Sequence, residues 1–351
     1  MRPFAILIIG AILFSPTPSN AWHKNGHMAV ARVAWQQLNA AQRAKYVAIL
    51  QNHPHKAAFL LVGQPQGVNT DEWMFVQAAT WPDWVRNPHG PGLGTQEMSS
   101  IRHTYHKSLW HFINLPFVNP AEVAMFDEAA IRQATLVPAL DSHGQPRHVL
   151  AAIQWNLGQL KNSSTPIQDQ AVALCWVLHL IGDIHQPLHA ATLIGSKSKF
   201  GPDGLLPPHG DEGGNSLAIR ATSNVQNATE LHTFWDALLV EDIPYPKVQS
   251  HVHDWLQLPE LKRSTLATEL AVTGFEKWAD ESLLLAKSAA YMDLNGNLLA
   301  VAILPPNHTP AALAGINAPP LPAGYQKRAE DIARKRIVLG GYRLGDQLVA
   351  P

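Results

Sequence analysis

The segment PIQDQAVALCWVLHLIGDIHQPLH, residues 166–189, joins a long apolar run to polar residues at helical spacing. It predicts a helix over 166–185 that Pro187 prevents from continuing. His179 and Asp183 are four residues apart and would lie on one face of that helix, where they could bind one divalent ion. Beyond the helix the chain can turn His189 toward a second position. The alternative is that these are hydrogen-bonded core residues.

A second pair with the same spacing strengthens the metal interpretation. In ELHTFWDALL, His232 and Asp236 are again four residues apart on an expected helix. The stretch ATWPDWVR supplies Asp83, which could equally be a helix cap. The stretch SLWHFIN supplies His111, which taken alone is more often a core residue. Repetition of the pair in one chain indicates metal binding more strongly than any single residue does.

Most of the remaining sequence also has helical spacing, so we expect a mainly α fold. Weak strand signals predict at most one hairpin arm, at 295–304, and the Gly- and Pro-rich stretches 192–214 and 305–324 are expected to be loops. No composition shift divides residues 22–351, which favours one domain, a helical bundle with a short hairpin and long loops. The further helices are expected at 27–38, 40–50 after the cap Asn39, 120–135, 147–161, 229–240, 264–290 and 325–348.

Residues 1–21 have the pattern of a signal peptide. Arg2 provides a positive start, an apolar run extends from Phe4 to Phe14, and Ser19-Asn20-Ala21 forms a cleavage signal. We therefore expect cleavage before Trp22 and a secreted or periplasmic protein without a membrane span. An uncleaved N-terminal anchor is the alternative. The single cysteine, Cys175, is expected to be a small buried residue rather than a nucleophile.

Composition limits the possible partners and metals. The chain has 18 His and 11 Trp, 15% charged residues and a formal net charge of −1, so no basic surface indicates nucleic-acid binding. The basic run at 327–336 alternates with acidic residues and is expected to be a solvated helix face. The candidate ligands offer imidazole nitrogen and carboxylate oxygen without thiolate. That donor set suits several Zn²⁺ ions at a hydrolytic site rather than a structural one.

Taken together, the motifs resemble those of a known family. The sequence is similar to the three-zinc single-strand nucleases and 3′-nucleotidases of the mung-bean-nuclease type, with zinc-dependent phospholipase C as a distant relative. The resemblance covers nearly all of residues 22–351. It is carried, in chain order, by WHKNGH, ATWPDWVR, WHFIN, HLIGDIHQPLH, GGN at 213–215, LHTFWD and AGYQKRAEDIARKRIVLGGYRLGDQL.

The resemblance implies how the ligands are distributed. One zinc would be held by Asp83, His111, His179 and Asp183. Another would be held by His27, Asp183 and Trp22, the last through its free α-amine and carbonyl oxygen. A third would be held by His189, His232 and Asp236. Because the nitrogen of Trp22 is an amide before processing, cleavage would complete the site. Three zinc ions and three aspartates would leave the site near +3, which attracts phosphate.

The resemblance also implies the reaction and its substrate contacts. Arg86, with Asp83, would act on the phosphate, Phe112 would stack on an unpaired base, and Asn215 would contact the base edge. Asn114 stands where the family often has Asp, which leaves base preference open. The expected activity is cleavage of single-stranded DNA and RNA to 5′-phosphate products, with hydrolysis of 3′-nucleotides, by a monomer.

Two other functions stay open on the sequence alone. A phospholipase C would share nearly all the ligands, although Asp236, Phe112 and the GGN stretch favour a nuclease. A periplasmic zinc-binding protein is the second alternative, and a fixed cation such as Arg86 beside the metals argues against it.

Overall fold

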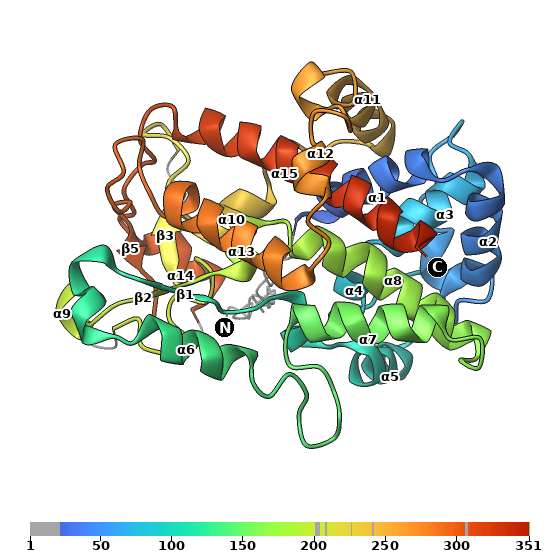
Figure 1. Cartoon of the computed structure of the whole chain (residues 1–351), viewed down its shortest axis with the longest axis horizontal. Coiled ribbons are helices and arrows are strands. Elements are labelled where there is room, and N and C mark those ends of the chain that lie inside the picture. The colour runs from blue at the N-terminus through green and yellow to red at the C-terminus, as the bar shows by residue number, and fades with distance from the viewer. Residues whose placement is uncertain are drawn as a thin grey trace, which may run out of the picture.

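The computed structural model describes residues 22–350 except 201–203, 208, 226, 241 and 306–307. The predicted signal peptide, residues 1–21, lies outside the described residues. The described part is mainly helical and compact, as the sequence predicts (Figure 1). The α-helices are α1 Lys24–Gln37, α2 Ala40–Leu50, α3 Thr70–Ala78, α4 Trp81–Trp84, α5 Thr95–Tyr105, α6 Glu128–Leu136, α7 Val149–Lys161, α8 Ile167–Asp183, α9 Lys197–Phe200, α10 Leu231–Asp236, α11 Tyr245–Trp255, α12 Ala267–Leu270, α13 Phe275–Leu285, α14 Pro310–Gly315 and α15 Tyr325–Val349.

Short strands and tight helical turns fill the connections. Strands β1 and β2 pair in parallel, whereas β3 lies between β4 and β5 in an antiparallel sheet. The strands are β1 Pro116–Val118, β2 Thr192–Ile194, β3 Leu217–Ile219, β4 Thr229–Glu230 and β5 Ala302–Ile303. The 3₁₀ turns are η2 Ser108–His111, η3 Pro120–Met125, η4 Pro187–Ala190 and η5 Pro259–Leu261, and the π turns are η1 Lys56–Leu60 and η6 Ala286–Ala290.

Helix α8 runs through the centre of the fold. Its C-terminal half, from Ala173 to Asp183, is buried without interruption, so this helix is apolar on all sides rather than amphipathic. It contacts α7, α1, α2, α4 and α15. Cys175 is fully buried among these helices, and burial raises the pKa of its thiol, as expected for a packing residue. His179 and Asp183 are thereby held on a rigid central element.

The two ends of the described chain pack against each other. Helices α1 and α15 cross in contact, and Gly341 of α15 sits where a Cβ would lie 2.3 Å from the Cβ of Val33 and 2.8 Å from the Val30 carbonyl oxygen. Figure 1 shows the red C-terminal helix against the blue N-terminal one. Glycine at this position allows the two helix backbones to approach closely.

We expect Gly341→Ala to lower the free energy of unfolding by about 1–3 kcal/mol, because the added methyl overpacks this contact. The matched control is Gly158→Ala in α7, where an added Cβ has nothing within 4 Å. That change should stabilise the protein by about 0.5–1 kcal/mol, because alanine loses less backbone entropy in a helix. Urea unfolding of both variants measures the difference, and equal effects would contradict the close α1–α15 contact.

Several sequence predictions need correction. The single helix expected at 120–135 is broken, because Asp127 caps a new helix: η3 precedes it and α6 follows. The helix expected at 264–290 is divided into α12, α13 and η6, with Gly274 as the cap of α13. The stretch 229–240 begins as strand β4. Both expected loops contain short elements, which are β2 and α9 in the first and α14 in the second.

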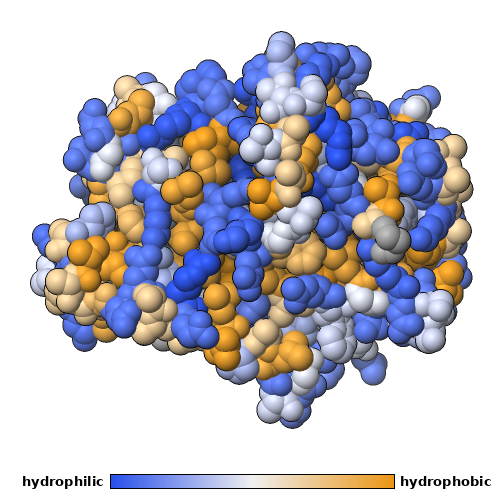
Figure 2. All heavy atoms as spheres, viewed as in Figure 1, coloured by the Kyte–Doolittle hydropathy of each residue, from blue (hydrophilic) through white to orange (hydrophobic). Residues whose placement is uncertain are grey.

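Other predictions agree closely with the structure. Helix α2 has the expected bounds, with a capping box between Asn39 and Gln42. The basic run in α15 is largely a solvated helix face, with Lys327 paired with Asp331 and Lys335 with Glu269, but its last residue, Arg336, is buried. Among the described residues, no helix is both long enough and apolar enough to cross a membrane. Figure 2 shows hydrophobic patches on one face interrupted by hydrophilic side chains.

Candidate metal centre and substrate cleft

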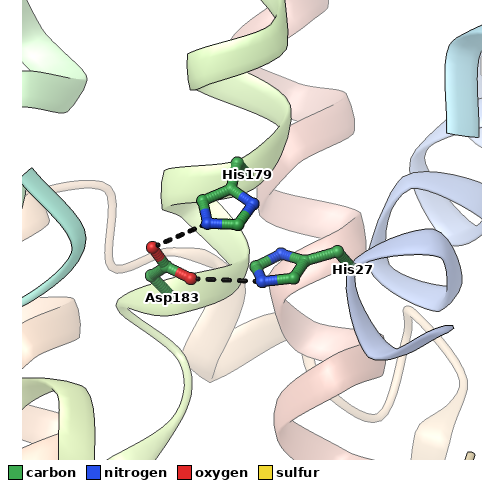
Figure 3. A group of neighbouring side chains, drawn as sticks. All are labelled: His27, His179 and Asp183. Atoms are coloured by element: carbon green, nitrogen blue, oxygen red, sulfur yellow. Dashed lines mark ion pairs between the residues drawn. The ribbon is translucent and has the colours of Figure 1, made fainter. Parts of the chain in front are cut away.

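Helix α8 presents His179 and Asp183 toward α1, which carries His27 (Figure 3). The His27 Nε2 lies 3.3 Å from Asp183 Oδ1, and the His179 Nε2 lies 3.3 Å from Asp183 Oδ2. Gly182 makes this approach possible, since a Cβ there would lie 2.9 Å from the His27 Nδ1. The three side chains are close enough to bind one cation.

Asp183 is shared with a second group of donors. His111 Nδ1 lies 3.1 Å from Asp183 Oδ2 and 3.0 Å from His179 Nε2. Asp83, on the short helix α4, places Oδ1 3.8 Å from His179 Nε2. Asp83, His111 and His179 form a second potential metal group, which contacts the first through both His179 and Asp183. A carboxylate with different partners on its two oxygens is suited to bridging two cations.

The third potential metal group comes from the turn after α8 and from α10. His232 Nε2 lies 3.3 Å from Asp236 Oδ2, and His189 Nε2 lies 3.8 Å from Asp236 Oδ1. Gln186 donates a 2.7 Å hydrogen bond to Asp236 Oδ1. Pro187 begins η4, which turns His189 back toward α10. The structure thus brings together every His and Asp side chain that the sequence analysis nominated as a metal ligand.

The hydrogen bonds at the backs of these imidazoles fix which nitrogen can bind a cation. The Nδ1 atoms of His179, His189 and His232 donate to the backbone carbonyls of Ala79, His111 and Gly213, at 2.8, 2.7 and 2.7 Å. Their Nε2 atoms therefore carry lone pairs. His189 and His232 point these lone pairs at each other across 3.1 Å, an arrangement that only a cation between them makes favourable.

Burial supports the same conclusion. Carboxylate oxygens of Asp83, Asp183 and Asp236 and both ring nitrogens of His27 are buried without hydrogen-bond partners. Burial raises the pKa of Asp83 to about 7 and lowers the pKa of His179 to about 3. Buried carboxylates and unpaired imidazoles are costly on their own, whereas divalent cations satisfy both. The nitrogen and oxygen donors therefore fit divalent metal ions.

Trp22 lies beside this centre. Its side chain is fully buried, and its Nε1 donates a 3.1 Å hydrogen bond to the carbonyl of Gly182, the residue before Asp183. Gly26 leaves room for it, since a Cβ there would lie 2.7 Å from the Cβ of Trp22. The first described residue is therefore held against the metal donors by its own side chain.

A buried arginine pair holds the turn after Asp183, and the sequence analysis did not identify it. Arg336 Nε donates to the His185 carbonyl at 3.0 Å, and Arg343 Nη1 contacts His185 Nε2 at 2.9 Å. Both guanidinium groups bind Glu281 of α13. His185 thus supports the turn and is in none of the three metal groups found among the described residues. The missed signal was the seven-residue spacing of the two arginines, which places them two turns apart on one face of α15.

The segment 192–214 forms part of the wall around the third group. Asp211 is fully buried and accepts hydrogen bonds from the backbone N–H groups of Leu193, Gly213 and Gly214 at 2.6, 3.2 and 2.8 Å. Thr192 and Tyr291 donate to it as well. Gly213 and Gly214 have φ values of 68° and 89°, which favour glycine. Asp211 therefore positions the Gly213 carbonyl, which in turn orients the imidazole of His232.

We expect Asp211→Asn to weaken the third metal group without changing any of its donors. Its Oδ2 accepts from Gly214, so an amide nitrogen at that place would face a backbone donor, at a cost of about 1–3 kcal/mol. Metal affinity should fall by roughly 10–100-fold, the effect typical of an outer partner. Metal titration monitored by thermal unfolding measures it. Tyr291→Phe, which removes only one donor, should have a smaller effect, and unchanged affinity in both variants would contradict the positioning role.

The metal groups open into a cleft of about 460 Å³. Its lining includes His111, His189 and His232, so donors from two of the groups face the same space. The four other nominated residues, Arg86, Phe112, Asn114 and Asn215, line it too. Arg86 Nη1 lies 3.7 Å from Asp83 Oδ1, and the Asn215 amide donates to the Glu212 carbonyl at 2.7 Å.

The cleft also contains residues to which sequence reasoning gave no role. The lining residues without a predicted role include Ser108, Leu109, Thr135, Arg147, His148 and Glu212. His209 and Glu212 belong to the segment 192–214, so this segment contributes side chains to the lining of the cleft. Several other histidines are in none of the three groups found among the described residues: His53, His55, His103, His106, His251 and His253.

Buried carboxylates and imidazoles clustered beside a cleft with an arginine define a class of metal-dependent phosphate-ester hydrolases. Comparison with known proteins agrees: the model of the S1/P1 nuclease family matches residues 22–350, and the chain belongs to this family. The chain is therefore a hydrolase that acts on phosphodiester bonds, and its relatives include endonucleases.

Two plant proteins illustrate the relationship. Endonuclease 1 of Arabidopsis thaliana is 25% identical over 356 residues, covering 97% of this chain and 90% of that protein. Endonuclease 4 of Arabidopsis thaliana is 28% identical over 226 residues, covering 59% of this chain and 62% of that protein. Nuclease activity and metal dependence are properties of the family to which this chain belongs. The three potential metal groups among the described residues agree with that metal dependence.

Proposed function

We propose that this protein is a zinc-dependent endonuclease that hydrolyses single-stranded DNA and RNA to 5′-phosphate products and also removes phosphate from 3′-nucleotides. The observation that carries the proposal is the set of three His/Asp groups, two of which contribute donors to one cleft that is also lined by Arg86 and Phe112. We further propose that the protein is exported, is cleaved before Trp22 and acts as a monomer.

The proposed ligand assignment follows the three groups. One zinc would be held by Asp83, His111, His179 and Asp183, another by His27, Asp183 and the backbone of Trp22, and the third by His189, His232 and Asp236. When bound, zinc at such groups lowers the pKa of water and offsets negative charge on phosphate oxygens. The sharing of Asp183 and the burial of Trp22 against Gly182 support this assignment.

The remaining roles belong to side chains in the cleft. Arg86, paired with Asp83, would hold the phosphate and stabilise the charge that grows on it. Phe112 would stack on an unpaired base, which explains a preference for single strands because a paired base cannot reach the ring. Asn114 and Asn215 would contact the base edge. The side-chain amide of Asn215 donates a hydrogen bond to the Glu212 carbonyl. Its side-chain oxygen is an acceptor that could receive a hydrogen bond from a base.

The test compares two substrates with one preparation. Protein that begins at Trp22 and is loaded with zinc should release nucleotides with 5′-phosphate ends from single-stranded DNA, and a chelator should abolish the release. Phosphatidylcholine vesicles at matched concentration test the alternative of a phospholipase C. Head-group release without DNA cleavage would overturn the proposal. Stoichiometric zinc without turnover of either substrate would indicate a zinc-binding protein instead.

A further inference from the structure

Two neighbouring residues in the cleft, Arg147 and His148, have no part in the proposed chemistry. They line the same cavity of about 460 Å³ as Arg86 and Phe112, together with Asn114 and Thr135. A cavity of that size is large enough for more than the atoms around one phosphorus. The cleft therefore extends beyond the metal groups.

The backbone around Arg147 is held firmly to the wall that bears His111. Asp141 forms a tight turn by accepting hydrogen bonds from the N–H groups of His143 and Gln145, at 2.8 and 2.9 Å. The N–H of Arg147 donates to the Ala139 carbonyl at 3.0 Å. The buried Trp110 Nε1 donates to the Pro146 carbonyl, also at 3.0 Å. Arg147 is thus fixed through a residue adjacent to a proposed metal ligand.

The Asp141 carboxylate interacts electrostatically with the Arg147 guanidinium, but not at ion-pair distance. The Arg147 side chain is exposed at the cleft, and it takes part in none of the ion pairs found in the described part of the chain. Its hydrogen bond within the protein is a long one, 3.5 Å from Nη1 to the Pro138 carbonyl. Arg86, by comparison, already has the carboxylate of Asp83 nearby. A guanidinium in this position can offer paired donors to an anion.

His148 fixes the start of α7 beside Arg147. It is 5% exposed and caps α7, a helix of 13 residues, by accepting the N–H of Ala151 at Nδ1 over 3.3 Å. The neutral ring therefore carries its proton on Nε2. That atom is buried, and the backbone carbonyl of Leu136 is its hydrogen-bonding neighbour, so the proton faces the protein rather than the cleft. The N-terminus of α7 contributes further positive potential at the same place.

We propose that Arg147, at the start of α7, forms a second phosphate subsite, which binds the backbone phosphate next to the scissile one in a single-stranded oligonucleotide. Phosphate oxygens accept hydrogen bonds only, and the guanidinium offers donors. The inference rests on the proposed function. It adds that the length of the nucleic-acid substrate affects the rate of hydrolysis. Substrates with a second phosphate gain a contact that a 3′-mononucleotide lacks.

The test measures kcat/KM for a trinucleotide and for 3′-AMP with the zinc-loaded protein. Arg147→Gln should lower the ratio of the two values roughly tenfold, the loss expected for one charge-assisted hydrogen-bonding group. It should also reduce the slope of log(1/KM) against log salt by about 0.7 for the trinucleotide, because one phosphate contact is lost. Arg147→Lys, which keeps the charge, should restore most of the slope.

One further variant separates binding from folding. Lys247→Gln removes a positive charge from exposed α11, which Figure 1 places across the molecule from α7, and it should leave both the ratio and the slope at wild-type values. An unchanged ratio in Arg147→Gln, or an equal fall for both substrates, would overturn the subsite. A wild-type protein that cleaves neither substrate would instead refute the proposed function.

Discussion

Replacing Asp183 by Asn should remove metal from two of the three donor groups at once and lower kcat/KM on single-stranded DNA by more than about 100-fold. Asp183 contacts His27 through Oδ1 and both His111 and His179 through Oδ2. An amide keeps the shape but presents N–H on one side, which cannot bind a cation. Loss of an outer partner alone costs roughly 10–100-fold, so loss of a shared ligand should exceed that.

Metal content and activity must be measured together to test this expectation. Elemental analysis should find fewer bound ions per chain in Asp183→Asn than in the wild type, and kcat/KM should fall in parallel. Asp346→Asn is the control, because the Asp346 carboxylate forms a surface pair with Arg263, and such pairs contribute little. Wild-type metal content in the Asp183 variant would show that the carboxylate is not a shared ligand.

A single residue added ahead of Trp22 should have an effect of similar size. The added residue turns the α-amine into an amide, which is a poor ligand, while Trp22 stays buried with its Nε1 on the Gly182 carbonyl. We expect the extended protein to lose about one metal ion, since a site with fewer good donors binds less tightly. Activity on single-stranded DNA should fall by at least roughly tenfold.

Two comparisons make that result specific to the amine. A residue added after Pro351 lengthens the chain equally and should leave metal content unchanged. Trp22→Phe keeps the free amine but removes the hydrogen bond to Gly182, so it should retain more metal than the extended protein does. If the extended protein binds metal and cleaves DNA as well as the form that begins at Trp22, the amine is not a ligand.

The sequence predicted the parts of this site that depend on local spacing along a helix better than the parts that depend on contacts between distant helices. Pairs such as His179 with Asp183 are local, since one helix turn fixes their relation, and both predicted pairs lie together in the structure. The meeting of His27 with Asp183 depends on packing between distant helices, so only the family resemblance could suggest it. Motif order supplied that information, because periodicity cannot indicate which faces meet.

The residues missed by sequence reasoning act over long range. Asp211 orients His232 through a glycine carbonyl, and Arg147 reaches the cleft only because Trp110 holds the preceding residue. Neither relation has a spacing that can be read along the chain. The wrong helix bounds in the sequence prediction have a similar origin. The helical spacing of apolar residues continues across Asp127 and Gly274, but each of these residues caps a new helix in the structure.

The contact between α1 and α15 makes one donor group depend on the last helix to be synthesised. His27 stands on α1, which packs against a helix that extends to Val349. A chain still on the ribosome has the first helix but not the last, so it cannot yet hold His27 firmly against Asp183. The donor group of His27, His179 and Asp183 is therefore complete only after the last helix has been made and has packed against the first.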